Sequence, residues 1–334
     1  MYELMRRRGR LVGIAISVLA VSAAVSTAEK LPWVAGSETV VVLPDTQRYS
    51  QKYPKVFEAQ TRWIADNYRK RNITYMLHLG DITQSDIHSE WKVAKHCITM
   101  LDGKTPYALA IGNHDYRGSR DKTLINEYFP PGKFEKWPTF GGVYKKGRIE
   151  NHYHLTKIQG RKWIILSLEY GPRYAVLDWA NKILTQHTDR LGMIVTHAYM
   201  FRNNVRYDHT KGKQRANPYG FDGEGSDGQE MWDKVVRKHP NMMIVISGHV
   251  RTGGPQGSYL ASKGDRGNVV HQMMTDYQKL PSGGKGYLRL LEFLPDGKTV
   301  QVRTYSPVSK RLRKSKFEDF RFELKRIEGS ALKI

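Results

Sequence analysis

The sequence contains a single cysteine, Cys97, among its 334 residues. One cysteine cannot form an internal disulfide, so this fold gains no covalent support of that kind. Cys97 lies in Glu90–Leu101, a run typical of a helix, and the sequence shows no neighbour that would stabilise a thiolate. We therefore expect a buried core thiol there and disfavour a mechanism based on a cysteine nucleophile.

Long hydrophobic runs are also scarce, and the one in the chain, Leu11–Val25, lies close to its N-terminus. Basic residues at 6–10 precede this run, and small residues at 26–28 follow it. This order predicts a secretory signal over residues 1–28, and hence an exported protein, periplasmic or extracellular. An uncleaved N-terminal anchor is the alternative, although the run is shorter than the ~20 residues that span a bilayer. We expect no transmembrane segment after the signal.

Acidic residues are few, 32 against 54 basic ones, which gives a formal net charge of +22. Loss of the signal, with four arginines and one glutamate, would leave about +19. Such a charge favours anionic partners, among them phosphorylated substrates and nucleic acid. An exported nuclease has weaker support, since the sequence shows no recognisable nucleic-acid motif. The densest basic stretch is Lys310–Lys316. We expect a main domain over 29–308 and a basic C-terminal extension over 309–334, with a solvated tail favoured.

Strand-like and helix-like segments alternate along the domain. Their order predicts one α/β domain with two sheets covered by helices. We expect strands at Thr39–Leu43, Tyr75–Leu79, Tyr107–Ile111, His152–Ile158, Lys162–Leu168, Met193–Thr196, Met242–Ser247, Asn268–Thr275, Tyr287–Phe293 and Thr299–Tyr305. We expect helices at Pro54–Arg69, Ser89–Leu101, Tyr174–His187 and Gln229–Lys238.

A long segment without clear periodicity, Ala198–Gly228, follows one of these strands. Loops of this length inside a compact domain are usually functional or disordered. Its aromatic residues could form a substrate wall or could anchor the loop, and the sequence leaves both open. They are Tyr199, Phe201, Tyr207, Tyr219 and Phe221.

Five polar clusters stand where strand-like runs end. Asp, Asn and His are ligands of hard and borderline metals, so clusters at five strand ends predict one metal site along a sheet edge. The clusters are Asp45-Thr46-Gln47, Gly80-Asp81, Gly112-Asn113-His114-Asp115, Thr196-His197 and Gly248-His249-Val250-Arg251.

Individual side chains suggest roles in that site. The period of two along a strand would place Asp45 and Gln47 on one face, toward one ion. Asn113 can offer a carbonyl ligand. His114 can donate a proton or contact phosphate, and Asp115 can hold its ring by accepting from the other nitrogen.

These clusters resemble the pattern of the calcineurin-like metallophosphoesterases: Asp-x-His, Gly-Asp, Gly-Asn-His-Asp/Glu, a His after a strand, and Gly-His-x-His. The resemblance implies a four-layer αββα sandwich, two mixed β-sheets flanked by helices, with a dinuclear metal centre. It implies that Asp81 bridges two ions, that Asp45 binds the first, and that Asn113, His197 and His249 complete the shell of the second.

The resemblance also implies the reaction. A hydroxide held by the ions would attack phosphorus in line. His114, supported by Asp115, would protonate the leaving group or stabilise the phosphoryl charge.

Two positions depart from the family pattern. Gln47 replaces one histidine, and Arg251 replaces the last; a guanidinium cannot bind a cation. Gln84 stands where the related purple acid phosphatases have a tyrosine, so a tyrosinate–iron centre is not supported. His271 could supply a replacement ligand. Alternatively, the first metal is weak or absent and Arg251 binds phosphate, or the protein only binds its ligand.

Together these features predict an exported phosphoesterase that uses one or two ions of Mn, Fe or Zn to hydrolyse a phosphate monoester or diester. The alternative is a non-catalytic module that binds an anionic polymer or a phosphorylated glycan in an altered cleft of the same family.

Overall fold

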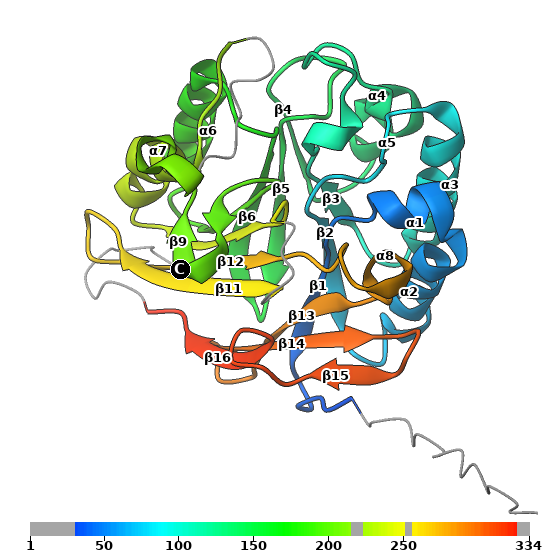
Figure 1. Cartoon of the computed structure of the whole chain (residues 1–334). Coiled ribbons are helices and arrows are strands. Elements are labelled where there is room, and N and C mark those ends of the chain that lie inside the picture. Colours follow the sequence, from blue (N-terminus) through cyan, green and yellow to red (C-terminus); the bar gives the residue numbers. More distant parts are fainter. Residues whose placement is uncertain (1–30, 215–222, 251–255, 326–334) are drawn as a thin grey trace, which may run out of the picture.

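The computed structural model describes residues 31–214, 223–250 and 256–325 (Figure 1). The expected signal, residues 1–28, lies outside these ranges. Within them, no helix combines the length and the hydrophobicity needed to span a membrane.

The first sheet has the strand order β15-β14-β13-β1-β2-β3, and β16 also pairs with β14. β1, β2 and β3 are parallel, whereas β13 runs antiparallel to β1 and continues the sheet through β14. The bounds are β1 (Glu38–Leu43), β2 (Ile73–His78), β3 (Tyr107–Leu109), β13 (Leu288–Phe293), β14 (Thr299–Ser306), β15 (Arg311–Arg313) and β16 (Asp319–Glu323).

The second sheet has the order β11-β12-β10-β7-β6-β5-β4. Its four central strands, β12, β10, β7 and β6, are parallel, so their carboxyl ends meet at one edge. The bounds are β4 (Phe140–Val143), β5 (His152–Ile158), β6 (Arg161–Leu168), β7 (Leu191–Thr196), β10 (Met242–Ser247), β11 (Gly257–Lys263) and β12 (Val269–Thr275).

Helices cover the outer side of each sheet (Figure 1). One group is α1 (Gln47–Lys52), α2 (Pro54–Asn67), α3 (His88–Ile98), α4 (Ile125–Tyr128), α5 (Pro131–Phe134) and α8 (Pro281–Gly284); on the opposite side of the molecule are α6 (Tyr174–Gln186) and α7 (Gly228–Lys234). The predicted mixed α/β fold with two sheets and flanking helices is confirmed.

Alternation along the strands builds the separate cores. In β1, Val40 and Val42 belong to the buried cluster shared by the two sheets, whereas Val41 and Leu43 pack in the cluster that contains Phe57 of α2. Cys97 is buried in this helix-side core, and burial raises the pKa of its thiol to about 12. The expectation of an inert core thiol is confirmed.

The basic C-terminal stretch differs from the prediction. Residues 311–313 and 319–323, expected in a solvated extension, form β15 and β16 and pair with β14. Phe322 of β16 is buried in the core between the sheets. The many basic residues of this segment therefore obscured the apolar side chains by which it packs against the domain. The boundary expected at residue 308 therefore falls inside the first sheet.

The long segment after β7 is partly ordered by a short hairpin of β8 (Met200–Phe201) and β9 (Val205–Arg206). Tyr199 is buried and donates its hydroxyl to Gln272 Oε1 at 2.9 Å, so it anchors the loop. Tyr207 packs instead with its ring 5.8 Å from that of His249. Tyr219 and Phe221 lie outside the described residues.

Candidate metal centre

Both sheets contribute strand ends to one site. The carboxyl ends of parallel strands meet at one edge of a sheet, and the edges of the two sheets face each other here. The residues that follow the strands are Asp45 after β1, Asp81 after β2, Asn113 after β3, His197 after β7, His249 after β10 and Asp276 after β12.

One half of the site is rich in nitrogen ligands. Asp81, His197 and His249 each offer a ligand atom within 4.8 Å of the other two. His197 Nε2 lies 3.2 Å from Asp81 Oδ1 and 3.0 Å from His249 Nδ1. His197 Nδ1 donates to the carbonyl oxygen of Leu79 at 2.9 Å, which directs Nε2 toward Asp81 and His249, where a metal would replace its proton.

Asn113 adds an oxygen to this half. Its buried Oδ1 has no hydrogen-bond partner among the described residues. A buried carbonyl oxygen without a donor is costly, and a cation would satisfy it. The predicted second-metal set of Asp81, Asn113, His197 and His249 therefore fits a metal ion.

The backbone of the site is held in unusual conformations. Asp45, Asp81 and His249 have positive φ values of 20°, 48° and 73°. Such conformations are disfavoured for these residues and cluster at functional sites. Gly112 and Gly248 allow the close approach: a Cβ at either position would lie 2.2 Å from Asp81 Oδ1 or 2.1 Å from Asp45 Oδ1, respectively.

The other half of the site contains oxygen ligands. Asp45 and Gln47 meet there, but not through strand periodicity as predicted, since Gln47 is the first residue of α1. Gln47 Nε2 donates to Asp81 Oδ2 at 3.0 Å and to Gln278 Oε1 at 3.0 Å. Gln278 Nε2 in turn donates to Asp45 Oδ2 at 3.2 Å and to Asp276 Oδ2 at 2.9 Å.

Sequence reasoning missed Asp276 and Gln278. A usable signal was present, because Asp276-Tyr277-Gln278 directly follows β12 and repeats the Asp-x-Gln spacing of Asp45-Thr46-Gln47. It is a sixth polar cluster at a strand end.

The carboxylates of the site have strongly perturbed pKa values. Burial, followed by the charge of Asp276, raises the pKa of Asp45 well above its usual range. Burial likewise raises the pKa of Asp276 to about 7. Burial acts in the same direction on Asp81, but His197 outweighs it and lowers the pKa of Asp81 to about 2. A bound cation would take the place of the protons that Asp45 and Asp276 otherwise retain.

His197 shows the reciprocal effect. Burial disfavours its charged form, but Asp81 and Asp45 outweigh burial and raise the pKa of the imidazole to about 10. The protonated imidazole therefore supplies the positive charge that a metal ion would otherwise provide in this site, which contains three buried carboxylates.

Asp115 does not hold the His114 ring, and that prediction is wrong. The Asp115 carboxylate accepts from the backbone N–H groups of Gly112, Ile82 and Thr83 at 2.7–3.0 Å, and so ties the two loops together. His114 Nδ1 instead lies 2.8 Å from the carbonyl oxygen of Gln84. The backbone N–H of His114 donates to Asp81 Oδ1 at 2.9 Å, which places His114 beside the site.

The candidate for the missing first-metal ligand, His271, is not supported. His271 lies in the middle of β12, where its Nδ1 is 2.7 Å from Tyr259 Oη and its Nε2 is 2.9 Å from the carbonyl oxygen of Glu323. Both nitrogens are thus engaged away from the metal centre, and the prediction of a ligand role is wrong. Arg251 lies outside the described residues.

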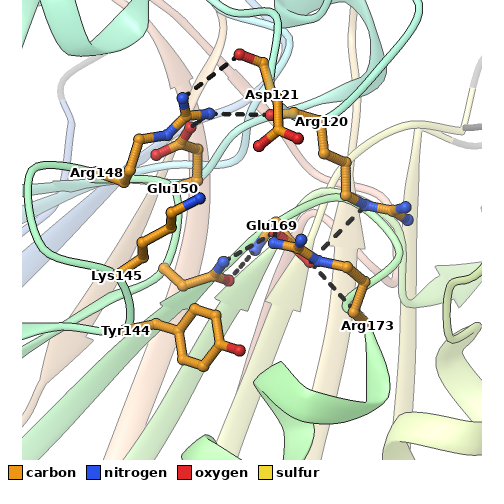
Figure 2. A pocket seen from close by; sticks show the side chains of 9 residues that line it. Arg120, Asp121, Tyr144, Lys145, Arg148, Glu150, Glu169 and Arg173 are labelled. Atoms are coloured by element: carbon orange, nitrogen blue, oxygen red, sulfur yellow. Dashed lines mark hydrogen bonds and ion pairs between the residues drawn. The ribbon is translucent and has the colours of Figure 1, made fainter. Parts of the chain in front are cut away.

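An ion-pair network lies behind the aromatic edge of the site. The Tyr170 ring, which follows β6, lies 5.3 Å from that of His249. Arg120 donates to the next backbone carbonyl, Gly171, at 2.7 Å. Figure 2 shows that Arg120 and Arg173 converge on Glu169, which Arg173 contacts through two hydrogen bonds of 2.8 and 2.9 Å. This network fixes the turn that carries Tyr170.

The comparison with protein families covers five of these six strand ends. The sequence model of the calcineurin-like phosphoesterases matches residues 38–252. The chain belongs to the calcineurin-like phosphoesterase family. The match spans five of the six strand ends, from Asp45 to His249, and ends before Asp276 and Gln278.

A curated bacterial protein is similar in sequence over most of this chain. The uncharacterized protein YvnB of Bacillus subtilis (strain 168) is 34% identical over 289 residues, which cover 84% of this chain and 21% of YvnB. The chain described here thus spans about a fifth of the length of that relative.

Two solved structures share the fold at low identity. Purple acid phosphatase PPD1 from yellow lupin (Lupinus luteus) seeds superposes with a TM-score of 0.51 and 14% identity, over 88% of this chain and 55% of that one. GAP50, the anchor in the inner membrane complex of Plasmodium, gives a TM-score of 0.50 and 9% identity, over 87% and 90% of the two chains.

Proposed function

We propose that this protein is an exported metal-dependent phosphoesterase that hydrolyses phosphate monoesters or diesters. The observation that carries the proposal is the nitrogen-rich half of the site. Three ligand side chains converge there from both sheets, and the unpartnered oxygen of Asn113 joins them. A protein that only bound anions would have no need to bury these metal-binding groups together.

Asp81, Asn113, His197 and His249 would hold a borderline ion such as Zn, Fe or Mn. When bound, metal ions supply Lewis acidity, generate a nucleophile from water and neutralise charge on the phosphoryl group.

The chain's own residues would handle the proton and the substrate. His114 Nδ1 lies 2.8 Å from the carbonyl oxygen of Gln84 and 2.9 Å from its side-chain amide nitrogen, so Gln84 orients the ring. In its doubly protonated form the ring would keep Nδ1–H on that carbonyl oxygen and pass its Nε2 proton to the leaving group. The backbone bond to Asp81 keeps that imidazole next to the metal centre. Tyr170 and Tyr207, whose rings lie 5.3 and 5.8 Å from the His249 ring, form an aromatic wall beside it.

Turnover of two generic substrates tests the activity. Chelator-treated protein should be inactive toward p-nitrophenyl phosphate and bis(p-nitrophenyl) phosphate. Addition of Mn²⁺, Zn²⁺ or Fe²⁺ should restore hydrolysis of at least one of them. If no metal restores turnover while polyanions bind with a steep salt dependence, the protein is the binding module that its net charge of +22 also suits.

Export has a separate basis and a separate test. It rests on the basic residues at 6–10 and the apolar run Leu11–Val25. When the full chain is expressed in a bacterial host, the protein should be recovered outside the cytoplasm with residues near 28 or 29 at its N-terminus. Retention in the cytoplasm, or an intact N-terminus in the membrane fraction, would contradict cleavage and export.

A further inference from the structure

Five oxygen-bearing side chains meet in the half of the site that lacks histidine. They come from the ends of β1, β2 and β12 and from the start of α1, and each is at most 8% exposed. They are Asp45, Gln47, Asp81, Asp276 and Gln278.

The contacts in this group form a continuous chain. It runs from Asp81 Oδ2 through the amide of Gln47 to the amide of Gln278, and from there to both Asp45 and Asp276, with every step between 2.9 and 3.2 Å. The NH₂ group of Gln278 therefore lies between two carboxylates, and that of Gln47 between a carboxylate and an amide oxygen, positions that would also favour a cation. Rotation of either amide would present its oxygen instead.

Ion pairs with the protein compensate little of the charge that this group carries when its carboxyl groups are ionised. Among the described residues, the ion pairs of Asp45, Asp81 and Asp276 consist of one contact, from His197 to Asp81. His197 lies on the nitrogen-rich side, where a metal would replace its proton. Buried carboxylates require compensation by a cation or by hydrogen bonds.

A second observation indicates a ligand here. Gln47 is fully buried, and its Oε1 has no hydrogen-bond partner among the described residues. The nitrogen of the same amide donates to Asp81 and to Gln278. The unpartnered oxygen therefore lies within the cluster of oxygen-bearing side chains. A metal ion would satisfy this oxygen.

We propose that Asp276 and Gln278 complete the first metal position together with Asp45, Gln47 and Asp81, and that this position takes a hard divalent cation such as Mg²⁺ or Mn²⁺. Carboxylate and carbonyl oxygens suit these ions, whereas imidazole suits zinc and iron. The two oxygens of Asp81 face the two halves, since Oδ1 lies near His197 and Oδ2 near Gln47. The replacement ligands for the lost histidines are then Asp276 and Gln278 rather than His271.

This inference shares Asp81 with the proposed function but is tested by binding rather than by turnover. Chelator-stripped protein is loaded with one equivalent of Zn²⁺ to fill the nitrogen-rich half. It is then titrated with Mn²⁺, and binding is measured by calorimetry and by the electron paramagnetic resonance signal of free Mn²⁺. The wild type should bind one further Mn²⁺ per chain. Asp276→Asn should weaken Mn²⁺ binding by at least about 10- to 100-fold, because even the loss of a residue that only hydrogen-bonds to a metal ligand lowers metal affinity by that factor. The zinc content of the variant should be unchanged.

A matched control uses another acidic group. Asp208, His209 and Asp227 also place ligand atoms within 4.8 Å of one another, and none of them belongs to the proposed oxygen-ligand group. Asp208→Asn should leave Mn²⁺ binding intact. The inference is overturned if the wild type binds no Mn²⁺, if Asp276→Asn keeps wild-type affinity, or if Asp208→Asn alone abolishes binding.

A second variant covers a folding failure of Asp276→Asn, detected by circular dichroism. Gln278→Glu adds a carboxylate and should tighten Mn²⁺ binding, and unchanged affinity would overturn the inference. The two proposals fail separately. Binding of Mn²⁺ without hydrolysis of any ester refutes only the phosphoesterase, whereas hydrolysis with zinc alone and no Mn²⁺ site refutes only the oxygen-ligand position.

Discussion

Asp81→Asn is expected to abolish metal-dependent hydrolysis, with turnover lowered by roughly 10³-fold or more. Metal ions contribute several kcal/mol to the transition state of such reactions, and about 1.4 kcal/mol corresponds to a factor of ten. Asp81 is the side chain with one oxygen toward each half of the site, 3.2 Å from His197 Nε2 and 3.0 Å from Gln47 Nε2. Loss of its charge should therefore weaken both metal positions.

Metal analysis of the purified protein separates this effect from misfolding. Asparagine has the shape of aspartate, and its oxygen can still accept from the His114 backbone N–H. The variant should keep the wild-type circular-dichroism spectrum while its metal content falls. Asp189→Asn is the matched control, because Asp189 forms an exposed ion pair with Lys162, and both metal content and turnover should stay unchanged. Wild-type metal content in Asp81→Asn would contradict the assignment.

The sequence predicted the nitrogen-rich half because each of its residues directly follows a hydrophobic strand. Parallel strands bring their carboxyl ends together whatever their separation along the chain, so the position of His197 after β7 or of His249 after β10 already implies convergence. The same logic predicted the order of strands and helices, since burial of alternate residues leaves a period that can be read locally.

The oxygen-ligand half could not be assembled in this way. Gln47 and Gln278 are hydrogen-bonded although they lie 231 positions apart, and the local sequence around either residue does not indicate which residue it contacts. The Asp-x-Gln spacing after β12 was visible, but it becomes informative only once β12 is known to lie next to β10 in the second sheet. His271 shows the opposite error: it belongs to the same strand, yet its place in the middle of β12 keeps it from the edge.

The contacts of individual side chains within a loop also could not be predicted from the sequence. Asp115 was expected to orient His114, its neighbour in the chain. The short 3₁₀ turn over Asn113–Asp115 directs the Asp115 carboxylate back to the N–H groups of the two loops, and the ring of His114 meets Gln84 instead. Adjacent residues in a tight turn point in different directions, so proximity in sequence did not imply contact.

The second large effect is expected for His114→Asn, which should lower kcat by about 10²- to 10⁴-fold, the usual contribution of a general acid. His114 is not needed to hold a metal in either half of the site, so metal content should match that of the wild type. Its ring bonds only to Gln84 among the described residues, through the backbone oxygen and the side-chain amide, so the loss of stability should be small. Steady-state kinetics with parallel metal analysis checks both expectations.

The size of the loss should depend on the leaving group. An alkyl phosphate needs a proton on its departing oxygen, whereas p-nitrophenolate leaves readily without one, so the variant should lose far more activity toward the alkyl ester. An equal loss for both esters would assign His114 to phosphate binding rather than proton transfer. His88→Asn provides the control, because His88 is an exposed histidine at the start of α3 that bonds Tyr128, and its replacement should change neither rate.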